Sequence, residues 1–222
     1  MALTDYSYLN NDQPASGRVF PNNILPTKIN VTIEQPTLTS TTNALTTQRR
    51  SLGAHRIKLE YTYPMMSAED MQPFVAFFSA MQGQGKSFKL NAPKELINDI
   101  THIADSDTHT VTTSYSTGDR EIVVGGFGNS LDTAIKGGNF IQFSNHDKIY
   151  VVAADGGSDG SGNCRIRIEP ALLENVTSSH TLNTFNEDIP IHAIFANDSF
   201  DFDINSALHY GFKIKFIEQW ED

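Results

Sequence analysis

Short runs in which apolar and polar residues alternate are the feature that most constrains this chain. Residues 28–34 read KINVTIE and residues 56–63 read RIKLEYTY, with an apolar side chain at every second position. The alternation returns near the other end, in residues 194–195, 200–204 and 210–217. Successive side chains of a strand point to opposite faces of a sheet, so this spacing predicts strands with one buried face.

Residues 105–185 differ in composition, because they hold most of the 15 glycines. Their apolar runs are short, and turn clusters such as GGFGNS, KGG, SNHD and DGGSDGSGN separate them. The runs are EIVV at 121–124, FIQF at 140–143, KIYVV at 148–152 and CRIRI at 164–168. Closely spaced short strands with glycine-rich turns predict a small barrel or sandwich. We therefore expect residues 105–185 to form a small β-barrel, inserted into a β-rich domain made of residues 1–104 and 186–222.

One segment has a helical period. Residues 67–82 place five apolar side chains on one face of a helix: Met71, Phe74, Val75, Phe78 and Met81. Ser67 or Asp70 can cap its start. Asp70 is the preferred N-cap, because Pro73 then falls in the first turn of the helix, where its missing N–H costs nothing. The predicted fold class is therefore mainly β with one clear α-helix.

The stretch AMQGQGKS at residues 80–87 ends as a phosphate-binding P-loop does. In that motif a strand runs into a loop that opens a helix. Here the order is reversed, since Gly83 and Gly85 end the helix and a short strand at residues 87–90 follows. The carboxyl end of a helix is partially negative and repels phosphate. A nucleotide hydrolase is disfavoured, and Lys86 is interpreted as a solvated or interface charge.

The other candidate sites are equally incomplete. The run DGGSDGSGN at residues 155–163 resembles a calcium loop but has Gly157 and Ile166 where that loop needs ligands, so a polar hairpin turn is expected. No histidine pairs with another His or Cys at helical spacing, and Cys164 is interpreted as a buried hydrophobe. Without a catalytic motif, we expect neither an enzyme nor a bound cofactor or metal.

Charge excludes further classes of function. The net charge is −10, whereas nucleic-acid-binding proteins usually carry a basic patch. A nucleic-acid-binding function is therefore not expected. No apolar run approaches the roughly 20 residues that span a bilayer, and the start of the chain does not resemble a secretion signal. No membrane association is expected.

Two segments are predicted to lack regular structure. Residues 1–26 contain several prolines and are expected to form an extended arm that does not pack. Residues 35–53 are rich in Thr and Ser and are expected to form a long loop ordered by a partner. The candidate residues for contacts between subunits or with a partner are Arg49, Arg50, Lys86, Phe216 and Trp220.

Two longer segments resemble a known family. They are RIKLEYTYPMMSAEDMQPFVAFFSAMQGQGKSFKL and IKGGNFIQFSNHDKIYVVAADGGSDGSGNCRIRIEPALL, which are followed by the closing strand FKIKFIEQW that contains Glu218. Over about residues 54–218 the chain resembles distal tail proteins of long-tailed bacteriophages, and tail-tube and tail-completion proteins share parts of the pattern.

The resemblance implies a split-barrel-like belt domain that forms a hexameric ring at the tail tip. It also implies an inserted barrel of the oligonucleotide/oligosaccharide-binding type. Such a ring joins the tail tube protein to the baseplate hub or tail fibres, and DNA passes through its lumen without specific binding. The expected location is the virion, after assembly in the host cytoplasm. An acidic lumen fits this role, because it repels DNA.

A carbohydrate-binding module is the alternative. Its support is the expected barrel, together with Tyr115, Phe127 and Tyr150 as aromatic platforms for a sugar ring.

Overall fold

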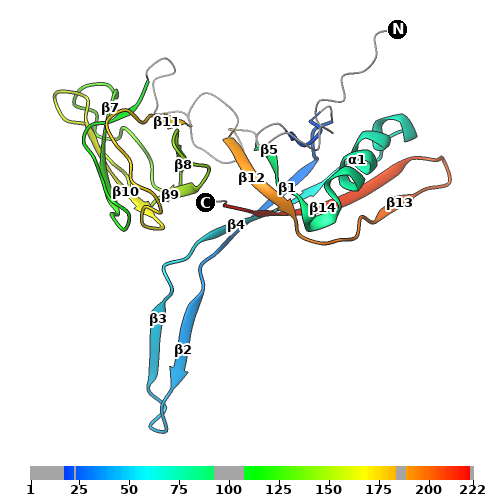
Figure 1. Cartoon of the computed structure of the whole chain (residues 1–222), viewed down its shortest axis with the longest axis horizontal. Coiled ribbons are helices and arrows are strands. Elements are labelled where there is room, and N and C mark those ends of the chain that lie inside the picture. Colours follow the sequence, from blue (N-terminus) through cyan, green and yellow to red (C-terminus); the bar gives the residue numbers. More distant parts are fainter. Residues whose placement is uncertain (1–17, 23, 93–107, 184–188, 221–222) are drawn as a thin grey trace. The chain divides into compact units, whose positions relative to one another are not determined.

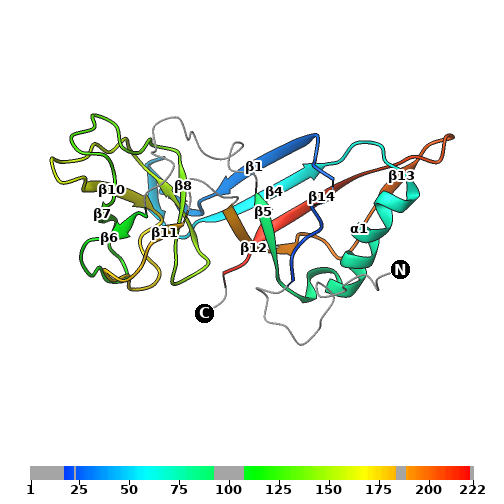
Figure 2. The same ribbon diagram turned by 90° about the horizontal axis from the view of Figure 1, so that it is seen from above.

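The computed structural model describes residues 18–22, 24–92, 108–183 and 189–220. It is mainly β, with 42% strand and 9% helix, so the predicted fold class is confirmed (Figures 1 and 2). The chain divides into two compact units. The first unit comprises Met1–Glu34, Arg56–Asn91 and Pro190–Asp222, and the second comprises Gln35–His55 and Ala92–Ile189. The predicted domain boundaries after residues 104 and 185 lie outside the described residues.

A six-stranded, curled half-barrel sheet forms the framework of the first unit. Its strands, in spatial order, are β1 (Lys28–Glu34), β4 (Arg56–Thr62), β14 (Tyr210–Glu218), β12 (Ile189–Phe195) and β5 (Phe88–Ala92), with β13 (Phe202–Ile204) also paired to β14. Figure 2 shows β1, β4 and β14 side by side. Strand β14 is central, because it pairs with β4 along one edge and with both β12 and β13 along the other.

The single α-helix of the described residues, α1 (Ala68–Met81), begins at Ser67. The Ser67 hydroxyl accepts a hydrogen bond from the Asp70 backbone N–H at 3.2 Å and donates one to the Asp70 carboxylate at 2.8 Å. The preference for Asp70 as the cap is therefore wrong, and Pro73 lies inside the helix. The Ser67 hydroxyl accepts from a backbone N–H of the first turn that has no partner within the helix. This bond favours a helix that starts after Ser67 over one that starts after Asp70.

The buried face of α1 also differs from the predicted one. Met71, Phe74 and Met81 are buried as expected, but Phe77 is fully buried while Val75 is 36% exposed. The helix is therefore rotated so that Phe77 faces the sheet. Helical periodicity defines a stripe of apolar residues, and the packing partner decides which flank of that stripe is covered.

The described part of residues 1–26 packs against the core, contrary to the expected extended arm. Phe20 is 3% exposed, and its ring centroid lies 5.0 Å from that of Phe216 and 5.5 Å from that of Phe77. The backbone N–H of Phe20 donates to the Lys89 carbonyl at 2.8 Å. This short segment therefore extends the sheet beyond β5 and supplies a central aromatic ring to the core.

A small closed barrel forms most of the second unit. Its strands, in spatial order, are β11 (Leu182–Asn183), β8 (Phe140–Phe143), β9 (Ile149–Val152), β10 (Cys164–Glu169), β7 (Glu121–Gly125) and β6 (Thr110–Val111). The two ends of this sheet are hydrogen-bonded, since Val111 N–H donates to the His180 carbonyl and Leu182 N–H to the His109 carbonyl. Alternate side chains of the strands fill the interior, as in other small barrels.

Among the residues that the structure describes, none of the helices combines the length and the apolar character that crossing a bilayer requires.

Candidate interaction surface

A fully exposed β-hairpin is present where a loop was expected. Strands β2 (Thr37–Thr41) and β3 (Thr47–Ser51) pair antiparallel, and every side chain on both strands is exposed. Its turn is held by the Thr46 N–H, which donates to the Thr42 hydroxyl, and by Leu45 in a left-handed conformation. β-branched threonine favours strands, so the composition that suggested a loop is compatible with a hairpin. The expectation of a loop at residues 35–53 is therefore wrong.

The two neighbouring arginines of the hairpin lie on opposite faces. Arg50 pairs with Leu38 across the strands, and Arg49 pairs with Thr39. Because paired residues share a face, Leu38 and Arg50 lie side by side on one face, while Arg49 lies on a face of threonines and Ser51. Gln35–His55 contains no acidic residue, so this hairpin is basic within a chain of net charge −10.

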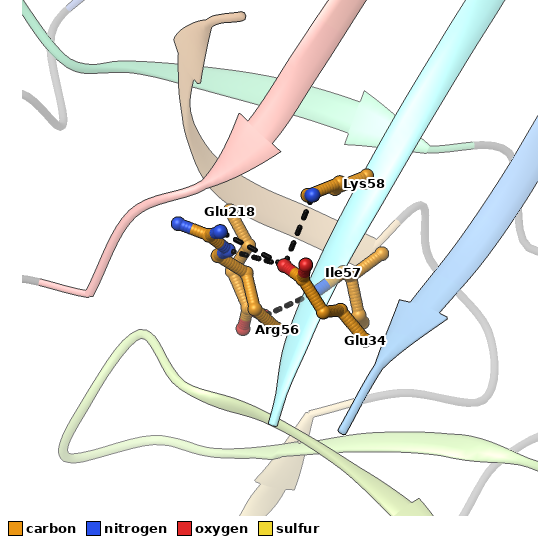
Figure 3. Close-up of polar contacts among 5 residues, drawn as sticks. All are labelled: Glu34, Arg56, Ile57, Lys58 and Glu218. Carbon is orange, nitrogen blue, oxygen red and sulfur yellow. Dashed lines mark hydrogen bonds and ion pairs between the residues drawn. The ribbon is translucent and has the colours of Figure 1, made fainter. Parts of the chain in front are cut away.

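An ion cluster marks the point where the first unit leads into the hairpin (Figure 3). Glu34 ends β1 and lies opposite Arg56, which begins β4. The Glu34 carboxylate is 2.8 Å from the Arg56 guanidinium and 3.0 Å from the Lys58 ammonium. These two cations, Arg56 first, lower the pKa of Glu34. The cluster therefore supports the register of β1 against β4 at the base of the hairpin.

A buried carboxylate supports the same strand from the core side (Figure 3). Glu218, the last residue of β14, is 5% exposed, and its Oε2 accepts a hydrogen bond from the Ile57 backbone N–H at 2.9 Å. The residue lies in the closing strand that carried part of the family resemblance. A buried backbone N–H of a strand needs a hydrogen-bond acceptor. The Glu218 carboxylate is that acceptor for Ile57, just beyond the last residue pair between β14 and β4.

Among the described strands, β1 pairs only with β4 and lies at an edge of the first sheet. Ile29, Val31 and Ile33 lie opposite Tyr61, Leu59 and Ile57, and therefore share the core face. The three β4 side chains are at most 3% exposed, yet Val31 is 38% exposed and Ile33 is 43% exposed. An edge strand with uncovered apolar side chains and a row of free backbone groups is a template for pairing with another chain.

An open groove lies elsewhere on the first unit, between the end of β12 and β13. Its volume is about 680 Å³, and the residues that line it include Met65, Phe78, Phe200 and Phe202, together with Asp201, Asp203, Lys213 and Lys215. Met65 is 55% exposed and Phe202 is 41% exposed. This groove was not predicted from the sequence. The alternation in FDFDI puts aromatic and acidic side chains on opposite faces of β13 and its approach, with Phe202 opposite Phe212 and Asp203 opposite Gly211.

The predicted contact residues fall into different environments. Arg49 and Arg50 are exposed on the hairpin. Phe216 is 1% exposed and lies in the aromatic core, so the expectation that it contacts a partner is corrected. Trp220 is half-buried, and its indole N–H is buried without a hydrogen-bond partner in the described residues.

Lys86 lies at the carboxyl end of α1, where its ammonium donates to the Ala80 carbonyl at 3.4 Å. A cation is favourable at this end of a helix. The chain reverses through a left-handed Gln82 and a 3₁₀ turn, η3 (Gly83–Gly85), before β5. The geometry thus places the Lys86 ammonium against a carbonyl of the helix end and not over the amino end of a helix, where phosphate would bind.

The aromatic side chains proposed as sugar platforms belong to the barrel interior. Tyr150 is fully buried, and its hydroxyl accepts from the Leu173 N–H and bonds to the His146 ring. Phe127 is 7% exposed, and the Tyr115 hydroxyl accepts from the Val123 N–H. Tyr150 and Phe127 offer no open ring face for stacking, so their assignment as platforms is wrong, whereas Tyr115 is half-buried and its assignment stays a prediction.

The residues considered for a calcium loop and for a reactive thiol have structural positions in the barrel. Asp159 accepts hydrogen bonds from the Ser161 and Asn163 backbone N–H groups, which lower its pKa. Asp155 accepts from the Gly137 N–H at 2.8 Å. Cys164 is fully buried, and burial raises the pKa of its thiol to about 11. Within the described ranges no group of His, Cys, Asp and Glu is arranged to hold a metal ion.

Comparisons with known proteins add no family: no family model matches the chain, and no curated protein matches it.

Proposed function

We propose that the chain is a structural subunit that assembles with copies of itself into a ring at the tip of a bacteriophage tail. The observation that carries this proposal is the edge strand β1, which pairs only with β4 among the described strands and whose core-facing Val31 and Ile33 are incompletely covered. A subunit whose sheet is incomplete can complete it with a neighbour, and identical neighbours related by rotation close a ring.

Two other features support the same role. Every side chain of the strands β2 and β3 is exposed, so this hairpin buries little apolar surface of its own chain. An isolated hairpin of this kind is only marginally stable, and contact with a neighbouring subunit would stabilise it. The acidic balance of the chain suits the wall of a channel through which DNA passes without sticking. In this role the ring, expected to be a hexamer, connects the tail tube to the baseplate hub or fibres and catalyses no reaction.

The test is self-association of the full chain, measured by sedimentation velocity over a range of concentrations and by negative-stain microscopy. We expect closed rings for the natural chain. Val31→Asp places a charge on the uncovered apolar row and should weaken assembly by at least tenfold in concentration, about 1.4 kcal/mol or more. Thr32→Asp is the matched control, because Thr32 is exposed on the opposite face of the same strand. A chain that stays monomeric at every concentration would contradict the proposal.

A further inference from the structure

The sheet of the first unit has a second edge strand, β13, on the side away from β1. Among the described strands β13 pairs only with β14, just as β1 pairs only with β4. Phe202 lies opposite Phe212 of β14, whose ring stacks on that of Tyr63 in the core. Phe202 and Ile204 point to this same core face, because they are two positions apart on one strand. They are nevertheless 41% and 54% exposed, so β13, like β1, carries two incompletely covered apolar side chains on the core face.

The two edge strands run in opposite directions. Strand β1 is antiparallel to β4, β4 is antiparallel to β14, and β14 is antiparallel to β13. When β13 of a second copy is placed beside β1, the alternation of strand directions continues, and the apolar faces of the two sheets stay on the same side. Strand β13 of one copy therefore fits β1 of another as the next strand of the same sheet.

The other partners that a second copy offers to β1 fit less well. Pairing of β1 with β1 is isologous, so it closes a dimer and leaves Phe202 and Ile204 uncovered in both copies. At its β5 end the sheet is already extended, since the Phe20 N–H donates to the Lys89 carbonyl there. Pairing of β1 with β13 covers both apolar pairs with one heterologous contact, which repeats from subunit to subunit around a ring.

We propose that β13 of one copy pairs antiparallel with β1 of the next, so that the sheet continues from one subunit into its neighbour. Val31 lies opposite Ile204, and Ile33 lies opposite Phe202. This register brings the two incompletely covered side chains of each strand face to face. The inference rests on the proposed function, self-association into a ring, and specifies which two strands meet.

The polar face of the sheet is compatible with the same register. It brings Asp201 of one copy next to Glu34 of the other, whose carboxylate already pairs with both Arg56 and Lys58. Two cations share one carboxylate in that cluster, so a second carboxylate beside it meets a surplus positive charge.

Substitutions on β13 test the contact with a control on the same strand. Ile204→Lys should weaken self-association of the full chain on the order of tenfold, because it places a charge opposite Val31. Asp203→Asn changes the net charge by the same amount on the opposite face, and should leave the association within about twofold. Equal effects of Ile204→Lys and Asp203→Asn would overturn the proposal.

A mixture of two variants tests which strands meet. Chains with Val31→Asp and chains with Ile204→Lys should each associate weakly alone, and should associate strongly when mixed. In alternating subunits the two introduced charges are opposite in sign and meet at one contact, while the natural side chains meet at the next. A mixture that associates no better than either variant alone would contradict the pairing of β1 with β13.

Cross-linking separates this inference from the proposed ring. Thr32 and Asp203 lie opposite each other on the polar face in the proposed register. Chains carrying Thr32→Cys and Asp203→Cys are mass-tagged, mixed and treated with a short bismaleimide, to which the buried Cys164 is inaccessible. We expect a mixed cross-linked pair, and none when Ser79→Cys, at an exposed position of α1, replaces Asp203→Cys.

The possible outcomes distinguish the two proposals. Rings without the mixed cross-link would overturn the strand pairing and leave the proposed function intact. The mixed cross-link in open chains without closed rings would support the strand pairing and contradict the ring. Cross-links only between two Thr32→Cys chains would show a β1–β1 dimer and overturn both, as would the absence of any association.

Discussion

The Glu218 carboxylate accepts a hydrogen bond from the Ile57 backbone N–H, and 161 residues separate the two along the chain. The bond joins the end of β14 to the start of β4, next to the Glu34 ion cluster from which the hairpin begins. The last strand of the chain therefore supports the strand that leads out of the hairpin.

Loss of the Glu218 carboxylate should destabilise the first unit. Glu218→Ala leaves the Ile57 N–H buried without its partner, which should lower the free energy of unfolding by about 2 kcal/mol. Glu60→Gln is the control, because Glu60 lies on the exposed face of β4 and its ion pair with Lys215 should contribute less than about 1 kcal/mol. Urea denaturation followed by tryptophan fluorescence measures both. Equal costs would show that the buried bond has no special role.

Removal of the Phe20 ring should be among the most damaging single changes. Phe20→Ala leaves a cavity between α1 and the sheet, and should cost about 3–5 kcal/mol. Leu25→Ala, at a nearby side chain that is 71% exposed, should stay within about 0.5 kcal/mol. The comparison uses thermal and urea unfolding of the full chain. A cost below about 1 kcal/mol for Phe20→Ala would mean that this segment is not part of the core.

A side chain at position 83 should strain the turn after α1. Gly83 has φ +62°, and an added Cβ would lie 2.7 Å from the Asp198 carboxylate oxygen. Gly83→Ala should therefore cost more than the roughly 1–2 kcal/mol of the left-handed conformation alone. Gly85→Ala in the same turn is the control, since its Cβ would meet the Gln82 side chain at 3.5 Å, an ordinary contact. Similar losses for the two variants, measured as shifts in the urea midpoint, would contradict the packing of residue 198 on this turn.

The barrel should lose stability in mild acid through His146. Burial lowers the pKa of this histidine to about 4, although the nearby Asp147 acts in the opposite direction. The unfolded chain takes up a proton near pH 6.5, which the folded barrel accepts only near pH 4. The free energy of unfolding should therefore be highest above pH 6.5 and fall as the pH decreases toward 4.

His146→Gln should flatten this pH dependence, because it removes the titrating ring that contacts the Tyr150 hydroxyl at 2.8 Å. His209→Gln changes an exposed histidine and should leave the slope unchanged. Urea midpoints between pH 4 and pH 7 make the comparison. An identical slope for the natural chain and His146→Gln would exclude His146 as the source.

Local patterns predicted the elements well and the contacts poorly. The alternation in residues 28–34 located β1 with the bounds that the structure has, and the run FIQF located β8. The same alternation did not reveal that Val31 and Ile33 are left uncovered. The threonine-rich hairpin was missed because its strands bury nothing, so no apolar period marks them.

Periodicity and turn residues act over a few neighbouring positions, so they suffice to identify this chain as mainly β with one helix. Which faces of these elements are covered depends on packing in three dimensions. The tertiary structure placed Phe216 and Tyr150 in two separate cores, although Phe216 was expected at a partner contact and Tyr150 on a sugar-binding surface. It also brought Phe20 beside Phe216 and placed β1 at the edge of the sheet that the described strands form. Burial depends on which distant strand or helix packs over a residue, and that information is not contained in any local pattern.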